Sequence, residues 1–420
     1  MKPADFIPFH RPSIGGSERQ AVLDVLDSGW LTTGSRAQEF EQRFGAFVGS
    51  KHAVAVNSAT AALHLALEGI GVGEDDEVII PTYTFAASGE TVLYQRARPV
   101  LVDVAEDSLG ADPAAVGAAV TERTKAVEVV HIGGLPADLA GIQASVQEAA
   151  RGLGIAAPPL VEDAAHAFPS PMPSSDGRFA GTVGRAGAFS FYATKTITTG
   201  EGGMLVTDDD DLAARARTMR LHGISHDAWK RYSAAGNWFY EITAAGFKDN
   251  LTDLAAALGI SQLERAGELQ RARASIADRY LAGLSGLEAE GRLKLPSAGT
   301  GDEHAWHLFV IRLADSARGP RSDEQRIDDG LPGVVGLPKA LRPLASRRAR
   351  AIERLRSAGI GVSVHFIPLH LHPLYRSMGY GPGDFPVSEA AYAGAISLPI
   401  WPDMSAGHVD RVIEAVCAVS

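Results

Sequence analysis

Lys195 is the lysine whose neighbours best suit covalent chemistry. It lies in the segment FSFYATKTITTGEGGML, after an aromatic strand-like run and before a glycine-rich turn that leads into another apolar run. A lysine that forms a Schiff base must shed its proton in a protected pocket, and small neighbours leave room for the bound group. Ala193, Thr194, Thr196 and Gly200 provide that room. A single lysine in a loop is usually a solvent-exposed residue without a catalytic role, but the residues around Lys195 favour a Schiff-base lysine.

Asp163 is the carboxylate best placed to work with such a lysine. A Schiff-base cofactor with a pyridine ring, pyridoxal 5′-phosphate (PLP), needs a carboxylate against its ring nitrogen, because the protonated ring is the electron sink of the reaction. Asp163 follows the apolar run PPLV, so we expect it at the carboxyl end of a parallel strand, where open α/β sheets bind ligands. The alternative is an N-cap for a helix over the following AAHA segment, which fits the residue equally well.

A phosphate anchor is expected where the chain passes from AVAV into NSATAALHLALEGIG. The N-terminus of a helix with small residues lets backbone N–H groups approach a phosphate. Ser58, Ala59 and Thr60 stand at that position, and the Ser190 hydroxyl is a second candidate for the same phosphate. An ordinary N-cap is the alternative, and for this segment alone it is the better supported one.

The elements around these residues predict an α/β fold. Short runs rich in Val and Ile alternate with alanine-rich helical stretches, which is typical of a mostly parallel sheet covered by helices on both faces. A chain of 420 residues exceeds one core. We therefore expect a large cofactor-binding domain over residues 1–260 and a smaller C-terminal α+β domain over residues 261–420.

The C-terminal half is predicted from its helical and alternating patterns. A long charged helix begins near residue 251, and HAWHLFVIRL and VSVHFIP are strand-like, with a helix ending RAIERLRSAGIG between them. The stretch 331–350 is rich in Gly, Pro and Arg and predicts a surface loop with no assigned function.

Composition excludes several other classes of protein. The formal net charge of −11 disfavours nucleic-acid binding, which needs a basic surface. The chain shows no membrane-spanning apolar run and no signal-peptide pattern at its N-terminus, so we expect a cytoplasmic protein. Cys417 is the single cysteine and is expected to be partly buried; an intrachain disulfide and a cysteine zinc site are excluded, and no metal site is predicted.

With these sites in order along the chain, the sequence resembles the DegT/StrS family of PLP-dependent sugar aminotransferases, which have the aspartate aminotransferase fold (fold type I). The likeness extends from GWLTTG near residue 30 to HFIPLHLHPLY and SLPIWP. Within the family, LHGISHDAWKRY followed by GFKDNLTD is similar to the 4-aminotransferases of nucleotide-activated sugars. The most specific matches are NSATAALHLAL, PTYTFAAS, VHIGGLPAD, VEDAAHA, FSFYATK, GEGGMLVTD and GFKDNLTDLAAALG.

The resemblance implies three cofactor contacts beyond those expected from the residues themselves. Phe85 should stack on the cofactor ring, and His166 stands near the ring hydroxyl, where many members have Gln. Asn250 should reach the cofactor phosphate of the partner subunit, which makes the active unit a homodimer with shared sites.

The resemblance also implies where the sugar substrate binds. The matching segments line the sugar-nucleotide cleft in relatives, although each of these residues is as compatible with simple packing. They are Trp30, Thr32, Thr33, Lys248 and His365.

The resemblance therefore implies transfer of an amino group from L-glutamate, through PLP, to the keto carbon of a nucleotide-linked keto-deoxysugar, with C4 the expected position. A 3-keto sugar or an aminocyclitol ketone is the alternative acceptor. Lys195 argues against a sugar dehydratase of the same fold, which has His in its place, and Cys417 is a poor candidate for a cysteine desulfurase. A catalytically silent DegT-like regulator is the alternative from another class, and it would not require both Lys195 and Asp163.

Overall fold

The structure is a computed structural model of the 420-residue chain. It describes residues 6–173, 177–224, 239–299, 303–314, 331, 333–334 and 336–419. Part of the LHGISHDAWKRY segment and part of the 331–350 stretch therefore lie outside the described residues. Among the described helices, none has the length and apolarity needed to cross a membrane.

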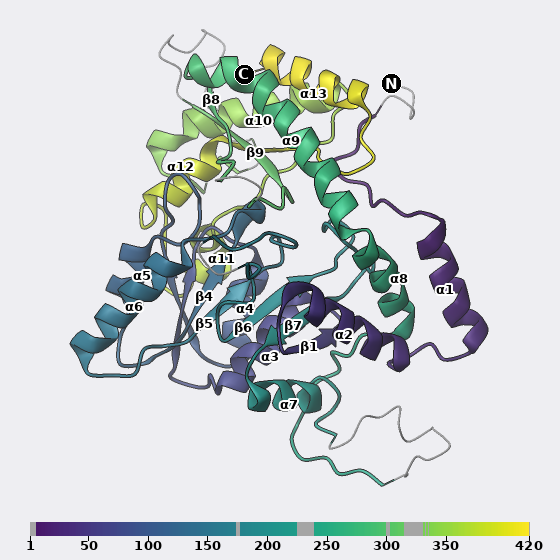
Figure 1. Ribbon diagram of the computed structural model, residues 1–420. Coiled ribbons are helices and arrows are strands. Elements are labelled where there is room, and N and C mark those ends of the chain that lie inside the picture. Colours follow the sequence, from purple (N-terminus) through teal and green to yellow (C-terminus); the bar gives the residue numbers. More distant parts are fainter. Residues whose placement is uncertain are drawn as a thin grey trace.

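A seven-stranded sheet forms the centre of the larger part of the molecule (Figure 1), and its strand order is β1-β7-β6-β5-β4-β2-β3. Neighbouring strands from β3 to β6 run parallel, while β7 is antiparallel to both β6 and β1. The predicted α/β fold with a mostly parallel sheet is confirmed. The strands are β1 (His52–Val56), β2 (Glu77–Pro81), β3 (Arg98–Val102), β4 (Thr124–Val130), β5 (Leu160–Asp163), β6 (Ala186–Ser190) and β7 (Gly203–Thr207).

Helices cover both faces of this sheet, because the strands carry apolar side chains on both sides. One core joins the sheet to α3 (Ala59–Ile70), α4 (Ala86–Tyr94) and α7 (Asp210–Met219). The other joins it to α2 (Ser35–Val48), α5 (Pro113–Ala119), α6 (Leu139–Leu153) and α8 (Asp253–Glu264). Both faces of β5, which carries Asp163, and of β6 and β7, which flank Lys195, are thus shielded from water.

The expected long helix after residue 251 is two helices, α8 and α9 (Ala266–Ala289). The break falls at Arg265, whose guanidinium donates to Glu18 of α1 (Gly16–Ser28) at 2.6 Å. Helix α9 then leads from the large sheet toward the C-terminal elements, as Figure 1 shows.

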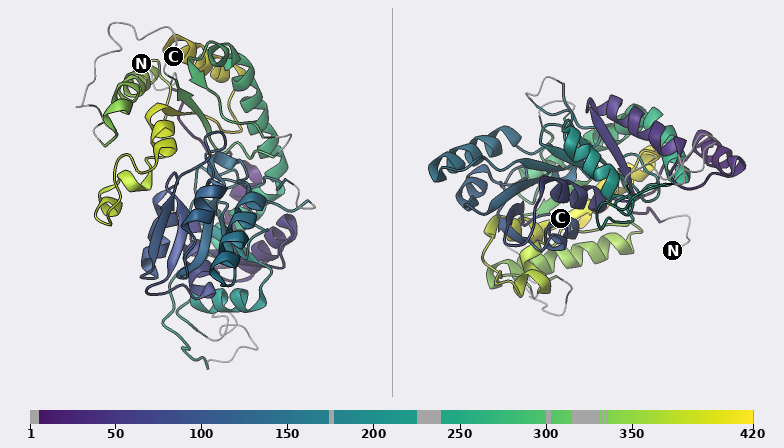
Figure 2. Two further views of the ribbon diagram at one scale, coloured as in Figure 1. Left: turned by 90° about the vertical axis from the view of Figure 1, so that its left-hand side faces the viewer. Right: turned by 90° about the horizontal axis from the view of Figure 1, so that it is seen from below.

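The C-terminal elements surround a smaller antiparallel sheet of order β10-β9-β8 (Figure 2). Its core includes Tyr280, Phe309 and Trp401 and extends to Tyr83 and Val130 of the large sheet region. The domain boundary at residues 260/261 stays a prediction. The elements are β8 (Leu293–Lys294), β9 (Phe309–Leu313), β10 (Ala395–Leu398), α10 (Arg342–Ser357), α11 (Pro373–Arg376), α12 (Pro386–Gly394) and α13 (Ala406–Val419), with 3₁₀ turns at η2 (Ile132–Gly134), η4 (Lys339–Leu341) and η5 (Leu369–Leu371).

Three expectations for this half were wrong. The end of the 331–350 stretch is helical, because α10 begins at Arg342 and buries Leu344 and Ala345, and a proline in a first helical turn is compatible with a helix. The VSVHFIP segment is no strand, since Ser363 forms a single bridge to Ser397. Cys417 is exposed on α13.

Candidate active site

Lys195 lies in the turn that joins β6 to β7. Its backbone N–H donates to the Tyr192 carbonyl at 2.9 Å, which closes the turn. Two contacts from distant segments hold the residues before it: the His10 Nε2 donates to the Ala193 carbonyl at 2.8 Å, and Arg273 donates to the Thr194 carbonyl at 3.4 Å. The turn is therefore fixed by the residues before α1 (6–15, the N-terminal arm) and by α9 as well as by its own strands.

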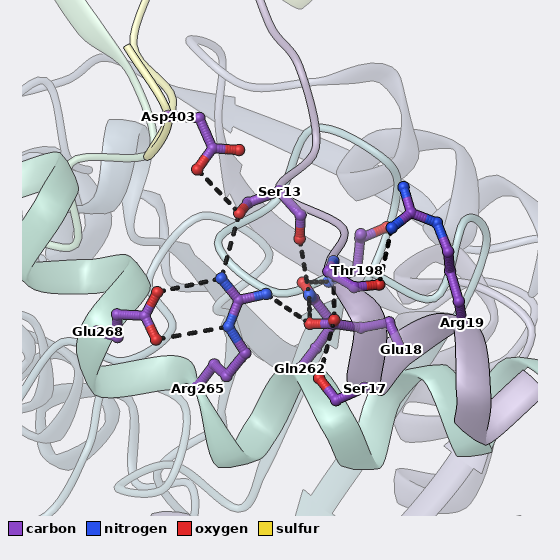
Figure 3. A network of polar contacts seen from close by, with 10 residues as sticks. Ser13, Ser17, Glu18, Arg19, Thr198, Gln262, Arg265, Glu268 and Asp403 are labelled. Atoms are coloured by element: carbon purple, nitrogen blue, oxygen red, sulfur yellow. Dashed lines mark hydrogen bonds and ion pairs between the residues drawn. The ribbon is translucent and has the colours of Figure 1, made fainter. Parts of the chain in front are cut away.

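A buried polar network fixes the far side of the same turn (Figure 3). The Thr198 N–H donates to Oε1 of Gln262 at 3.3 Å. The amide of Gln262 donates to the Ser13 carbonyl at 3.0 Å and to Glu18 at 2.8 Å, and Glu18 also accepts from Arg265. One side-chain amide thus joins the turn to the N-terminal arm and to the junction of α8 and α9.

The Lys195 amine is partly buried and is poised to lose its proton. Desolvation lowers its pKa to about 8, although the Asp163 carboxylate acts in the opposite direction; the Arg273 guanidinium adds to the lowering. A neutral amine is the form that attacks a carbonyl group, so this environment suits covalent attachment of an aldehyde cofactor.

Asp163 ends β5 with its carboxyl buried, at 6% exposure. Its Oδ1 accepts from the Ala165 N–H at 3.1 Å, and its Oδ2 accepts from the Ser88 hydroxyl at 3.1 Å. No helix follows, because residues 165–169 form turns, so the carboxyl does not cap a helix. Burial raises the pKa of Asp163, while the Ala165 N–H and the Lys195 charge oppose that rise.

The expected phosphate anchor is a helix N-terminus. Ser58 caps α3, and its hydroxyl accepts from the Ala61 N–H at 3.1 Å. Ala59 and Thr60 occupy the first turn, where a helix offers its own N–H groups no carbonyl partner. Gly203 begins β7 beneath this turn, and a Cβ there would collide with the Ser58 backbone. Ser190 pairs with Gly203, which brings the second candidate hydroxyl to the same place.

Phe85 and His166 form walls beside Phe366. The His166 ring stacks on Phe366 with centroids 5.7 Å apart and an interplanar angle of 14°, and Phe85 packs against Phe366 at 5.8 Å. The His166 Nδ1 accepts from the Gly133 N–H at 3.2 Å, which leaves Nε2 to donate. Phe85 is 59% exposed, so its ring is accessible from solvent.

His307 belongs to this site and was missed by sequence reasoning. Its Nε2 lies 3.4 Å from the Lys195 amine, and its ring lies 4.4 Å from that of His166. His307 is 6% exposed, its Nδ1 has no partner among the described residues, and burial lowers its pKa well below 6.5. The signal that could have found it was a second histidine in HAWHLFVIRL, which the apolar alternation concealed.

Four of the expected substrate residues lie around Asn250. They are Trp30, Thr32, Thr33 and Lys248. Thr33 accepts from the Asn250 amide at 2.6 Å, Lys248 donates to Asn250, and the Trp30 indole donates to the Thr33 carbonyl at 3.3 Å. Thr32 is exposed beside them. The structure therefore joins these residues and Asn250 into one polar cluster at the start of α8.

His365 lies apart from that cluster and near Lys195. Its Nδ1 hydrogen-bonds the Ser397 hydroxyl at 2.8 Å, and its ring stacks on Phe9 at 5.4 Å. Burial, with a smaller contribution from the Lys195 charge, lowers the pKa of His365 to about 4. His365 is thus a neutral polar group close to Lys195 and His307.

The residues present fit PLP. An amine of lowered pKa, a buried carboxylate and a helix N-terminus with a close-packed glycine supply the three groups that an aldehyde, a pyridine nitrogen and a phosphate require. Across the described residues, no cluster of three or more His, Cys, Asp or Glu is arranged to hold a metal ion.

Comparison with known proteins agrees with this geometry. The sequence profile of the DegT/DnrJ/EryC1/StrS aminotransferase family matches residues 12–327 and 334–417. The spore coat polysaccharide biosynthesis protein SpsC of Bacillus subtilis is 44% identical over 418 residues, which cover 99% of this chain and 97% of SpsC.

Solved structures show the same likeness over the whole chain. Spr1654 from Streptococcus pneumoniae, in its PMP form, superposes with a TM-score of 0.83 at 30% identity, covering 99% of this chain and 97% of Spr1654; its PLP form gives the same TM-score. The sugar aminotransferase CalS13 from Micromonospora echinospora superposes with a TM-score of 0.80 at 27% identity and covers 98% and 99% of the two chains. The chain accordingly belongs to the DegT/DnrJ/EryC1/StrS aminotransferase family and is a PLP-dependent sugar aminotransferase.

Proposed function

We propose that this enzyme transfers the amino group of L-glutamate to the C4 keto carbon of a nucleotide-linked keto-deoxysugar. The observation that carries the proposal is the buried pair of Lys195 and Asp163 beside the N-terminus of α3, within a sugar aminotransferase fold. The name of SpsC, which places that relative in polysaccharide biosynthesis, supports a sugar destined for a glycan.

Lys195 and Asp163 have distinct roles in the proposed reaction. Bound PLP supplies a conjugated ring that accepts the electron pair released when a proton leaves Cα of the amino donor. Lys195 would hold the cofactor covalently between turnovers. Once displaced, its amine would move the proton from Cα of the donor to C4′ of the cofactor, and in the second half-reaction it would move a proton from C4′ to the acceptor carbon of the sugar. Asp163 accepts a hydrogen bond from the ring nitrogen and keeps that nitrogen protonated.

The remaining cofactor contacts are assigned to surrounding residues. The N–H groups of Ala59 and Thr60 and the hydroxyls of Ser58 and Ser190 bind the phosphate. A helix N-terminus with a close-packed glycine beneath it supports this assignment, because it favours a nearby anion. Phe85 stacks on the ring, and His166 donates from Nε2 to the ring hydroxyl; the hydrogen bond that Nδ1 accepts supports that tautomer.

The active unit is proposed to be a homodimer in which Asn250 completes the partner's phosphate site. The exposed apolar side chains Tyr192 and Ile242, at 46% and 69% exposure, support a surface that a second subunit covers.

The nucleotide part of the substrate is proposed to bind beside Trp30, Thr32, Thr33 and Lys248, with His365 at the sugar. Lys248 supplies an exposed positive charge in a protein of net charge −11. An indole can stack on a base, and an ammonium attracts a diphosphate, which is why this polar cluster suits a nucleotide diphosphate.

A coupled assay tests the proposal. The purified protein with PLP is incubated with L-glutamate and with UDP- or TDP-linked 4-keto-6-deoxyhexoses, and 2-oxoglutarate is measured. NMR of the product then assigns the aminated carbon. Amination at C3, or of an aminocyclitol ketone only, would replace the acceptor while keeping the reaction, and a protein that binds no PLP would support the regulator.

A further inference from the structure

Glu128 is a buried carboxyl group that the proposed reaction does not use. It lies in β4 within the apolar run TKAVEVV, and its side chain has no exposure to solvent. Neither of its carboxyl oxygens has a hydrogen-bond partner among the described residues. A buried charged carboxylate without donors is strongly destabilising, so the group must be neutral or must interact with its neighbours in a way that compensates for its burial.

Glu162 on the neighbouring strand β5 provides the matched contrast. It is equally buried, but it accepts four hydrogen bonds, from His131 at 2.9 Å and from the N–H groups of Gly181, Val183 and Gly184 at 2.5 to 2.7 Å. These donors hold the pKa of Glu162 below its ordinary value despite burial. Glu128 has no such set, so burial and the nearby Asp163 charge raise its pKa well above 4.5.

The Ser88 hydroxyl connects Glu128 with Asp163. Ser88 lies in α4 and donates its single hydrogen to Oδ2 of Asp163 at 3.1 Å. The same hydroxyl opposes the rise in the Glu128 pKa that burial and Asp163 cause. An ionised Glu128 would compete with Asp163 for that hydrogen. A protonated Glu128 instead offers a hydrogen of its own, and the Ser88 oxygen, which also contacts the Thr84 hydroxyl at 2.8 Å, has lone pairs to accept it.

We propose that Glu128 is a positioning residue that stays protonated and donates through Ser88 to Asp163, so that Asp163 carries the one negative charge of the pair. The inference rests on the proposed function, in which Asp163 faces the cofactor nitrogen. Hydrogen bonds in such a chain polarise one another. The donor behind Ser88 therefore holds the Asp163 carboxylate in one orientation and in its anionic form.

Few charged or titratable groups face the hydrogen-bond chain of Glu128, Ser88 and Asp163 in the described part of the protein. Asp163 is acted on by the Lys195 and His131 charges, which favour its ionised form. Tyr375 of α11 is the other titratable group near Glu128; its hydroxyl also has no partner among the described residues, and burial together with the Glu90 and Glu128 charges raises its pKa. A second charge on Glu128 would therefore face the Asp163 carboxylate and a neutral phenol, and among the described residues no donor is hydrogen-bonded to its oxygens.

The pH dependence of unfolding tests the ionisation state without any substrate. Because the folded protein keeps a proton on Glu128 that the unfolded chain loses above about pH 4.5, wild-type stability falls relative to Glu128→Gln as the pH rises. The melting temperature of the PLP-bound Glu128→Gln protein minus that of PLP-bound wild type should increase from pH 5 to pH 8. An unchanging difference, or a shift in the opposite direction, would overturn the protonated state.

Infrared spectroscopy provides a second, direct readout. In the PLP-bound wild-type protein, the carbonyl band of an unionised carboxylic acid should be present at neutral pH and should disappear in Glu128→Gln. Absence of that band overturns the proposal, whatever the enzyme's substrate proves to be.

Turnover and the cofactor spectrum then test the role in positioning. Glu128→Gln keeps a neutral donor of the same shape and should stay within about threefold of wild type, whereas Glu128→Leu removes the donor and should lower turnover about tenfold. Glu128→Leu should also shift the pH titration of the visible cofactor band, which simple loss of packing would not do. Equal loss in both variants, or an unmoved titration in Glu128→Leu, would leave Glu128 without this role. Failure to aminate any sugar while these spectral shifts occur would count against the substrate and not against Glu128.

Discussion

The Lys195 amine lies 3.4 Å from Nε2 of His307, a residue 112 positions further along the chain. Burial keeps the His307 ring neutral, so Nε2 can accept a hydrogen from the lysine but cannot bring a positive charge to it. The contact therefore orients the amine without repelling its protonated form. It also joins the turn after β6 to the segment that leads into β9.

Replacing His307 by Phe should retain the ring contact with His166 and remove the acceptor. We expect turnover to fall about tenfold, because one hydrogen bond to a charged group is lost, and the pH optimum to move because the Lys195 pKa changes. Steady-state rates from pH 6 to 10 check this.

His304→Phe is the matched control. His304 is equally buried and stacks on Trp306 at 3.8 Å, but it does not contact Lys195. It should lower the melting temperature and leave the pH profile in place. A profile identical to wild type in His307→Phe would show that the contact only packs the site.

Replacing Lys195 by Ala should leave a folded protein that binds PLP without a covalent bond. Turnover should fall at least about a hundredfold, because both the anchor and the acid/base group are removed. Borohydride treatment followed by mass spectrometry should add the cofactor mass to wild type and not to the variant. Wild-type-like turnover in Lys195→Ala would refute the assignment.

Replacing Asp163 by Asn should separate charge from shape. The amide keeps the volume but cannot hold the ring nitrogen protonated, so proton abstraction should slow by about two orders of magnitude or more, while the melting temperature changes little. Single-turnover rates with L-glutamate and thermal melts are the measurements. Full activity together with a lowered melting temperature would mean that Asp163 only stabilises the fold, through its hydrogen bond with the Ala165 N–H.

Covalent attachment of PLP to the cofactor-free protein should accelerate as the pH rises through about 8. The sign follows from the Lys195 pKa: desolvation lowers it from 10.5 to about 8, so the reactive neutral amine is present above pH 8 and lost below it. Timed borohydride trapping measures the rate, and Nα-acetyllysine is the reference, whose rate should rise near its ordinary pKa. Identical pH profiles would show that the fold does not activate this amine.

Mixing two inactive proteins tests the shared site. Lys195→Ala and Asn250→Ala subunits, once exchanged, should form hybrid dimers with one site carrying both lesions and one carrying neither, so activity should reappear. The test needs an Asn250→Ala parent that is inactive by itself. Active monomers in light scattering, or no recovery after verified exchange, would count against the proposed contact across the dimer.

The sequence indicated the sheet and the placement of Asp163 and Lys195 because both depend on local order: an apolar strand, then a short turn. His307 and Ser88 could not be found in that way, since their contacts with Lys195 and Asp163 join segments 112 and 75 residues apart. Glu128 was overlooked because one acidic residue within an apolar run does not alter a strand pattern. The helix α10 was missed because Gly and Pro near its start favour a loop until the burial of Leu344 is known.

The N-terminal arm contributes His10 and Ser13, and α1 contributes Glu18, to the framework around the Lys195 turn. An enzyme immobilised for synthesis should therefore not be coupled to its support through the N-terminal arm. A strained linkage there would displace the Lys195 turn and weaken cofactor binding before it disturbed the large sheet. Cys417, the single thiol of the chain, is exposed on α13 and offers a site for oriented attachment to a support. Attachment through Cys417 would leave the N-terminal arm free to hold the Lys195 turn in place through repeated cycles of use.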